Sequence, residues 1–420
     1  MTEQAVREFR RSNWRFVVSI SGGGSAFISD YLALPGASGT FLEAVVPYSQ
    51  EATDAFLGFR PENYCSERTA RQLAAQARAR AVELTELAAR SDAPIVGIGV
   101  AASLASDRPK KGAHRVCCAV QTRGAVFSAE LNLTKDARTR AQEERLAADF
   151  ILSVLLFAAS TVESGGIEPW REHRAALTPR TDEPLFPTDE ASISWAALDE
   201  LGVQLLDSEL AALRRFQGRT DRIRANDATE KELRGDVWLS VDAPPRALYP
   251  GSFNPPHAGH IEIARLAAEQ RETPVELEIS ARNVDKPPID ALELTRRLDA
   301  LEKIAPDLPV WLSNAPRYIE KALVFPNASF IMGTDTILRL ADPKYADAST
   351  ERRDAILVKL QELHVSICVF TRKVEGKIIP IEELERELPE PLIEICDFVP
   401  EDVFLNDASS TEIRKNARLS

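Results

Sequence analysis

The chain has 420 residues, a length that predicts two or three domains rather than a single core. Hydrophobic residues make up 44% of it and charged residues 27%, which is typical of a globular protein and excludes a largely disordered one. The formal net charge of -13 argues against nucleic acid as the main partner, because phosphate binding needs a clustered basic surface.

The cysteines and the apolar segments indicate the cellular compartment in which we expect the protein. Five cysteines with no CxxC pair predict neither a zinc site nor a full disulfide framework, and we expect buried, reduced thiols. The N-terminus lacks the long apolar core of a secretory signal. The most apolar run, residues 148–160, is shorter than the roughly 20 residues of a membrane span. We therefore expect a cytoplasmic protein with no membrane partner.

Residues 1–160 alternate strand-like and helix-like stretches, which predicts an α/β domain. Strands are expected over residues 16–20, 41–48, 94–102, 114–122 and 125–133, and helices over residues 66–91 and 135–160. Arg123 and Gly124 stand at a predicted hairpin between the last two strands. Because the apolar run continues a charged helical stretch, we expect one long helix whose second half is buried.

Residues 161–245 have a weaker pattern and are predicted to form a linker with a short helical segment. The stretch 163–190 is rich in proline, glycine and charge, as linkers are. Residues 194–216 have the apolar spacing of a helix, which could bridge the flanking regions or belong to either of them.

Residues 246–420 alternate again and predict the second domain. Strands are expected over residues 246–250, 275–280, 309–313, 329–333, 365–370 and 394–399, and helices over residues 260–272, 290–304, 317–325 and 350–364. Repeated strand-helix-strand units predict a Rossmann-like parallel sheet with helices on both faces. Such sheets bind ligands at the carboxyl ends of their strands, near the point where the strand order reverses. The fold class is therefore α/β, with two α/β domains.

Two of the five histidines, His257 and His260, lie three residues apart within YPGSFNPPHAGHIEIARL, between a glycine turn and a helix. Gly251 allows a tight turn after the strand, and the helix start offers unpaired N–H groups and a positive dipole end, which suit phosphate. The two histidines could face one anion together. Two other interpretations stay open: cap residues without a ligand, and a zinc site, for which no third ligand stands close.

The string GSFNPPHAGH resembles the H/TxGH signature of the nucleotidyltransferase superfamily. Farther along, FIMGTDT resembles the GxD segment of nicotinamide and nicotinate mononucleotide adenylyltransferases, and SSTEIR resembles their ISSTxIR motif. Asn254 matches one branch of this family, whereas other members carry aspartate there. Ala408 stands where isoleucine is usual, a change that removes some packing and no chemistry.

The resemblance implies transfer of AMP from ATP to nicotinamide or nicotinate mononucleotide, with release of pyrophosphate, in NAD biosynthesis or salvage. It implies that His257, His260 and Arg414 are the catalytic residues and hold the triphosphate, and that Asp335 binds a ribose hydroxyl. The other residues that it implies for ATP or substrate binding are Gly251, Ser252, Phe253, Asn254, Gly259, Lys286, Gly333, Ser409, Ser410 and Thr411.

The partners implied are ATP, a pyridine mononucleotide and Mg²⁺, which would bridge the phosphates, and no protein metal site is predicted. We also expect a homo-oligomer. Lys286 could contact a phosphate or be a solvated surface lysine. Trp311 could stack on a pyridine ring, although a core position is favoured. The choice between nicotinamide and nicotinate depends on a few loop contacts that the sequence does not specify.

Residues 14–160 resemble the CinA C-terminal family, the nicotinamide mononucleotide amidohydrolases, through SISGGGS, LPG, VVPYSQEA and SERTARQLA. The resemblance implies that Ser21 occupies the position of the nucleophile, and Tyr48 is retained. Ile20 replaces the family's glutamate, Thr53 replaces the lysine thought to activate the serine, Gly22-Gly23 replaces Cys-Thr, and IGVAAS replaces TGIAGP. A serine without a nearby base is a poor nucleophile. We therefore expect a degenerate domain with a possible vestigial site, kept for binding, oligomerisation or regulation.

Three alternative functions remain. An active first domain would make the chain bifunctional and would supply nicotinate mononucleotide to the second domain. A cytidylyltransferase acting on a phosphorylated alcohol shares HxGH but usually ends in an RTxGISTT-like string, so SSTEIR and MGTDT speak against it. A non-catalytic nucleotide sensor fits the altered first site but not the intact phosphate motifs of the second domain.

Overall fold

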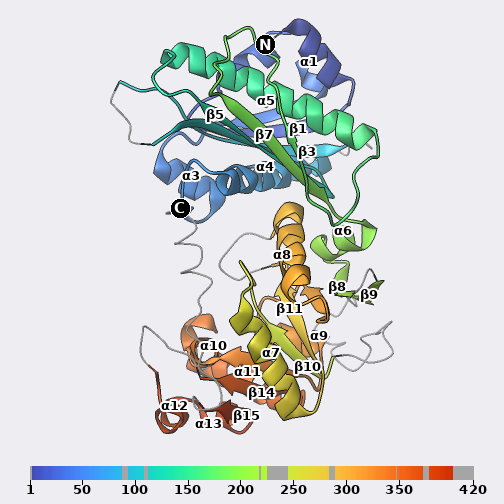
Figure 1. Cartoon of the computed structure of the whole chain (residues 1–420), viewed down its shortest axis with the longest axis vertical. Coiled ribbons are helices and arrows are strands. Elements are labelled where there is room, and N and C mark those ends of the chain that lie inside the picture. The colour runs from blue at the N-terminus through green and yellow to red at the C-terminus, as the bar shows by residue number, and fades with distance from the viewer. Residues whose placement is uncertain are drawn as a thin grey trace. The chain divides into compact units, whose positions relative to one another are not determined.

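The computed structural model describes residues 2–87, 93–107, 112–216, 245–282, 289–346, 348–371 and 378–400, and the backbone of 219–224. The chain divides into two compact units, Met1–Asp199 with Asp290–Thr295 and Glu200–Ile289 with Arg296–Ser420. Each unit is built on its own sheet (Figure 1). The expected fold class, two α/β domains, is confirmed.

The first unit holds a seven-stranded mixed sheet with the order β2-β1-β3-β4-β5-β7-β6. The strands are β1 (Arg15–Ser21), β2 (Phe41–Val45), β3 (Ile95–Ser103), β4 (His114–Gln121), β5 (Ala125–Leu133), β6 (His173–Ala176) and β7 (Glu190–Ala197). The first three run parallel, and the other neighbouring pairs are antiparallel. The helices are α1 (Glu3–Arg10), α2 (Ala26–Leu32), α3 (Gln50–Leu57), α4 (Glu67–Leu87) and α5 (Arg140–Glu163), with a 3-10 turn at Ala37–Gly39.

Helix α5 is the central helix of the first core and lies on the sheet face opposite α4 (Figure 1). It begins with a reciprocal capping box between Thr139 and Gln142. By length and composition α5 could span a membrane, but 72% of its most apolar window is buried inside the domain. This burial is typical of a core helix and confirms the predicted long, partly buried helix.

The segment predicted as a linker, residues 161–245, instead contributes strands to both sheets where it is described. Strands β6 and β7 extend the first sheet, and α6 (Glu200–Leu206) is followed by β8 (Leu210–Phe216) and β9 (Arg219–Arg224), which extend the second. The chain therefore passes from the first unit to the second near residue 199, without a separate linker domain. The prediction of a helix over residues 194–216 is wrong, because this stretch forms the end of β7, α6 and β8. Strands β6 and β9 lie at the sheet edges, and β7 and β8 pair with them. The prediction missed these strands because strand conformation depends on pairing with a neighbour more than on the strand's own residues.

A buried ion pair between Arg138 and Asp189 ties the segment before β7 to the first domain. The two side chains are 1% and 2% exposed. The Asp189 carboxylate also accepts the backbone N–H groups of Thr134 and Phe186, each at 2.8 Å. Several donors therefore converge on one carboxylate, and this favours its ionised form.

We expect the first domain to lose stability in acid through Asp189. Burial by itself raises the pKa of this carboxyl, but hydrogen bonds from Arg138, Thr134 and Phe186 outweigh it and lower the pKa from 3.8 to about 2. The ionised group therefore stabilises the folded state above about pH 4, and about 2 kcal/mol is lost as the pH falls toward 2. Urea unfolding of wild type and Asp189→Asn between about pH 2 and 5 checks this. Equal pH dependence in the two proteins would contradict it.

The second unit holds an eight-stranded sheet with the order β15-β14-β13-β10-β11-β12-β8-β9. Its remaining strands are β10 (Ala247–Pro250), β11 (Val275–Ser280), β12 (Val310–Ser313), β13 (Ser329–Gly333), β14 (Ser366–Phe370) and β15 (Cys396–Val399). These six are parallel, as predicted, and β8 is antiparallel to β12. The helices are α7 (Ala258–Arg271), α8 (Ala291–Ile304), α9 (Tyr318–Val324), α10 (Thr334–Ala341), α11 (Thr350–Glu362), α12 (Ile381–Glu387) and α13 (Glu390–Ile393), with a 3-10 turn at Pro343–Tyr345.

One face of the second sheet carries a buried polar cluster beneath α9. The Lys321 ammonium lies 2.8 and 2.7 Å from the two Glu278 carboxylate oxygens, and the Ser313 hydroxyl donates to the same carboxylate. The side chains of Lys321 and Glu278 are 5% and 1% exposed. Trp311, on the same face, is fully buried and donates its indole N–H to Glu276 at 2.6 Å. Trp311 is therefore a core residue and does not stack on a ligand.

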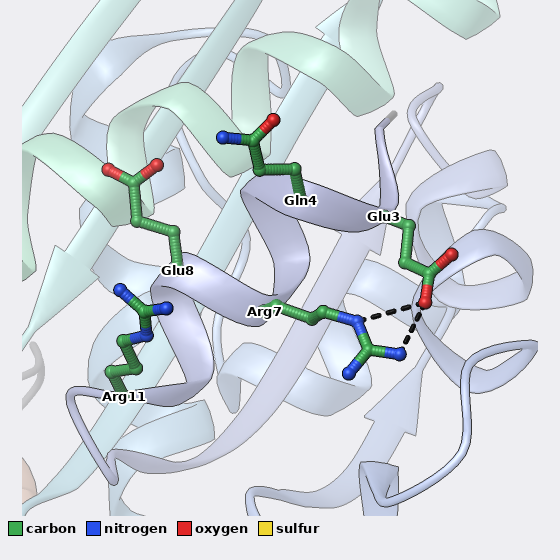
Figure 2. A pocket seen from close by; sticks show the side chains of 5 residues that line it. All are labelled: Glu3, Gln4, Arg7, Glu8 and Arg11. Carbon is green, nitrogen blue, oxygen red and sulfur yellow. Dashed lines mark hydrogen bonds and ion pairs between the residues drawn. The ribbon is translucent and has the colours of Figure 1, made fainter.

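A surface depression of about 390 Å³ lies on α1 and is lined by Glu3, Gln4, Arg7, Glu8 and Arg11 (Figure 2). Four of these side chains come from one short helix, and Arg11 is its C-cap residue. The Arg7 guanidinium donates to Glu3 at 2.9 Å, and Arg180 pairs with Glu8 at 2.8 Å. Opposite charges that already pair with each other are typical of a solvated helix face. This depression therefore carries no sign of a ligand site.

Candidate functional site

The two motifs that flank the predicted pocket follow neighbouring strands of the second sheet. Strands β10 and β13 pair in parallel, with Leu248 opposite Phe330. From β10 the chain proceeds to β11 and β12 on one side, whereas β14 and β15 lie on the other side of β13. The strand order therefore reverses between β10 and β13. This is the place where open parallel sheets bind ligands.

The turn after β10 is folded tightly over its own phenylalanine. A Cβ atom at Gly251 would lie 2.7 Å from the Phe253 ring, so no larger residue fits there. The Gly251 N–H donates to the Glu278 carbonyl at 2.9 Å. Phe253 is fully buried, and its ring meets those of Tyr249 and His260 edge-on, at centroid distances of 5.7 and 5.1 Å. The turn is thus held by packing as well as by backbone bonds.

His257 and His260 lie against each other at the start of α7. Helix α7 begins at Ala258, two residues earlier than predicted, with His257 as its N-cap. The ring centroids are 3.7 Å apart, and the ring planes are tilted by 34°. His260 Nδ1 accepts the His257 backbone N–H at 3.2 Å. Because Nδ1 accepts, the proton of the neutral ring is on Nε2, which makes Nε2–H a donor suited to a phosphate oxygen.

The second motif places a carboxylate at the start of the helix after β13. Gly333 is the N-cap of α10, and Asp335 lies in its first turn. The Asp335 carboxylate pairs with Arg339 at 3.0 Å, and the two side chains are 36% and 61% exposed. An exposed pair of this kind contributes little stability, so a ligand hydroxyl can compete for the carboxylate.

The structure brings nine of the predicted site residues to these two adjacent strand ends: Gly251, Ser252, Phe253, Asn254, His257, Gly259, His260, Gly333 and Asp335. The remaining predicted residues lie outside the described part of the chain: Lys286, Ser409, Ser410, Thr411 and Arg414. Among the described residues, no group of three or more His, Cys, Asp or Glu side chains could hold a metal ion.

One residue at this turn, Arg297 of α8, was not predicted from the sequence. Its Nη1 donates to the Ser252 carbonyl at 3.1 Å, and the residue is 9% exposed. Within the sequence, Arg297 stands in an ordinary charged helical run beside a second arginine. No local pattern distinguishes an arginine that turns inward from one that faces solvent.

In the first domain, Ser21 ends β1 and is half-buried. Its hydroxyl lies 3.5 Å from that of Thr53. The Thr53 hydroxyl donates within its own neighbourhood, to the carbonyls of Pro47 at 2.9 Å and Ser49 at 3.0 Å. Thr53 can accept a hydrogen bond from Ser21, but a neutral hydroxyl is too weak a base to activate that serine. Tyr48 is 66% exposed.

The glycine turn after Ser21 holds an anion that belongs to the chain itself, the Glu144 carboxylate. Glu144 accepts the Gly24 N–H at 2.9 Å and the Ser25 hydroxyl at 2.8 Å. Burial raises the pKa of Glu144, but these hydrogen bonds and Arg140 outweigh it, and the net shift is downward. Arg140 also donates to the Gly22 carbonyl at 2.9 Å. The turn is therefore an anion-binding concavity whose Gly24 N–H and Ser25 hydroxyl are engaged by a carboxylate of the chain itself.

Two known protein families match the two domains of this chain separately. The CinA C-terminal domain family matches residues 1–155, and the cytidylyltransferase-like family matches residues 248–416. No curated protein matches the chain significantly.

Three solved structures are similar to part of the chain. The competence or damage-inducible protein from Enterobacter asburiae is 16% identical with a TM-score of 0.27, over 39% of this chain and 96% of that one. The CinA superfamily protein from Klebsiella pneumoniae is 16% identical with a TM-score of 0.29, over 38% and 97%. The competence/damage inducible protein CihA from Agrobacterium tumefaciens is 18% identical with a TM-score of 0.27, over 38% and 90%. From the family matches, the chain combines a CinA C-terminal domain with a nucleotidyltransferase domain of the cytidylyltransferase-like type.

Proposed function

We propose that the second domain transfers AMP from ATP to nicotinamide or nicotinate mononucleotide and releases pyrophosphate. The observation that carries this proposal is the pair of contacting histidines at the start of α7, beside the point where the strand order reverses. Resemblance of FIMGTDT and SSTEIR to mononucleotide adenylyltransferases favours the adenylyl group over the cytidylyl group.

In the proposed reaction, a phosphate oxygen of the mononucleotide attacks the α-phosphorus of ATP. A new P–O bond forms, the bond from the α-phosphorus to the bridging oxygen breaks, and pyrophosphate leaves with that electron pair. The protein needs to supply alignment and charge stabilisation, and no covalent nucleophile. The His260 Nε2–H, His257 and the start of α7 would hold phosphate oxygens. The Asp335 carboxylate would accept a hydrogen bond from a ribose hydroxyl.

For residues outside the described part of the chain, the proposed roles rest on the resemblance of their motifs to mononucleotide adenylyltransferases. Ser410, Thr411 and Arg414 would bind the β- and γ-phosphates, and Lys286 the substrate side. Mg²⁺ would enter with ATP, held mainly by phosphate oxygens and water. The ion would neutralise phosphate charge.

The deciding experiment follows pyrophosphate release from purified protein with Mg²⁺-ATP and each mononucleotide separately. CTP with phosphorylated alcohols is the parallel reaction, because the matching family is described as cytidylyltransferase-like. We expect turnover with ATP and a pyridine mononucleotide. Turnover with CTP alone would overturn the proposal in favour of a cytidylyltransferase. Nucleotide binding without any turnover would favour a sensor.

For the first domain we propose a degenerate site without amidohydrolase activity. Thr53 stands where a base would be needed, and Glu144 occupies the glycine turn. Ser21→Ala is expected to leave adenylyl transfer within about twofold of wild type, because Ser21 belongs to the other unit and the substitution removes only a hydroxyl. Ammonia release from nicotinamide mononucleotide should be absent in both proteins. Ammonia release by wild type that Ser21→Ala abolishes would show that the first domain is an active amidohydrolase.

A further inference from the structure

Arg297 is a buried cation beside the turn that carries the phosphate motif. It is 9% exposed, and its Nη1 donates to the Ser252 carbonyl at 3.1 Å. Ser252 itself is exposed, so the arginine contacts the backbone of the turn from its inner side. A hydrogen bond from an ionised donor is stronger than one between neutral groups. Arg297 is therefore placed to control the direction of one peptide group in the turn.

That peptide group joins Ser252 to Phe253. In a trans peptide the carbonyl and the following N–H point in opposite directions. When Arg297 holds the Ser252 carbonyl toward α8, the Phe253 N–H is directed to the other side of the turn. Backbone N–H groups are what a glycine-containing turn offers to phosphate. The arginine thus sets the direction of a donor that it does not itself touch.

The conformation of the turn makes such a restraint necessary. Phe253 has φ 43°, in the left-handed region that non-glycine residues rarely adopt. A conformation of this kind costs on the order of 1–3 kcal/mol and persists only where the surroundings enforce it. Three contacts do so: the burial of the Phe253 ring, the Gly251 N–H bond to Glu278, and the Arg297 bond to Ser252. Of the three, only the last brings a positive charge.

We propose that Arg297 is a positioning residue for nucleotide binding: it orients the Ser252–Phe253 peptide so that the turn presents N–H donors to the phosphates. The expected effect of Arg297 on turnover rests on the proposed adenylyltransferase function. The expected effect of Arg297 on the conformation of the turn is independent of that function. The positive charge also lowers the cost of bringing a polyanion to this turn.

The test compares Arg297→Gln and Arg297→Lys in the full-length protein, with Arg265→Gln as matched control. Arg265 lies on α7, is 59% exposed and pairs with the exposed Asp307 at 3.6 Å. Three quantities are measured: hydrogen exchange of peptides that cover residues 250–256, the Kd for Mg²⁺-ATP by calorimetry, and KM and kcat for pyrophosphate release. A purely structural role would shift the melting temperature without separating KM from kcat.

For Arg297→Gln we expect faster exchange in the turn and a rise of roughly 10- to 100-fold in both Kd and KM for ATP, as for loss of a charge-assisted hydrogen bond. The kcat should change much less. Arg297→Lys should recover part of the affinity, because an ammonium can replace one of the donors. Arg265→Gln should match wild type in all three measurements.

The outcomes separate this proposal from the proposed function. If wild-type protein neither binds ATP nor turns it over, the adenylyltransferase assignment fails, and exchange in the turn alone then decides the role of Arg297. Exchange in Arg297→Gln that equals that of Arg265→Gln overturns the proposal. Faster exchange combined with unchanged affinity for ATP, in a protein that binds ATP, overturns it as well.

Discussion

Replacement of His260 by alanine is expected to lower the kcat/KM of pyrophosphate release by about 10²- to 10³-fold, the usual cost of removing one donor that stabilises transition-state charge. His260 Nδ1 is engaged with the His257 N–H, so Nε2 is the nitrogen that would serve the phosphates. The ring is only 9% exposed and packs on Phe253. Alanine therefore also removes packing, and activity must be compared at a temperature where the variant is folded.

Two further substitutions separate the capping role of His260 from its proposed phosphate role. In His260→Asn, the amide oxygen can still accept a hydrogen bond from the His257 N–H, but no donor remains at the position of Nε2–H. In His260→Gln, the longer amide can reach toward the Nε2 position. We expect the asparagine variant to be as inactive as alanine, and the glutamine variant to retain part of the activity.

His364→Asn is the control for loss of a histidine. His364 is exposed in a turn at φ 53°, a conformation that asparagine also adopts readily. It should leave both stability and turnover near wild type. Full activity in His260→Asn would remove the proposed phosphate role and leave His260 as a helix-capping residue.

Replacement of Lys321 by methionine is expected to cost about 3–5 kcal/mol of the stability of the second domain, because it leaves the buried Glu278 carboxylate without a counter-charge. The two residues come from different elements, α9 and β11, so the pair also joins a helix to the sheet. The Ser313 hydroxyl alone cannot compensate a buried carboxylate.

The measurement is native-state hydrogen exchange of peptides from β11 and β12 at increasing urea concentration, which reports on this domain separately from the first. The double variant Glu278→Leu with Lys321→Met should recover much of the loss, because removing both charges of a buried pair is often neutral. Arg265→Gln, which alters only an exposed pair, is the control. A loss below about 1 kcal/mol in Lys321→Met would show that the carboxylate is protonated or solvated in the folded protein.

Much of the second domain could be predicted from local pattern. Most of its six parallel strands are short apolar runs bounded by turn residues, and the strands VELEIS and SFIMG were predicted to the residue. The first sheet was harder. Its antiparallel half includes β6, an edge strand within a stretch rich in proline, glycine and charge, and β7, whose second half has the apolar spacing that predicted a helix.

Part of the candidate site could also be predicted, because some of its signals are local in the sequence. A glycine turn followed by two histidines at helical spacing is a local signal, and so is Gly333 with Asp335 after a strand. The interactions of Arg297, Lys321 and Glu144 are not local. Each depends on a contact with a residue far away in the sequence, and their own neighbourhoods read as ordinary charged helices.

The sequence by itself determined that this chain has two α/β domains, that its second domain carries two histidines at a strand-to-helix turn, and that Thr53 stands at the position for which the CinA resemblance implies a lysine. These properties depend on residue type and short-range spacing, which the chain carries wherever it folds. The tertiary structure decided that the two motifs follow adjacent strands and that Trp311 is a core residue. It also decided that the glycine turn after Ser21 holds Glu144, and that Arg297 donates a hydrogen bond to the turn after β10. Those properties depend on which distant segments pack together, and no local pattern encodes that pairing.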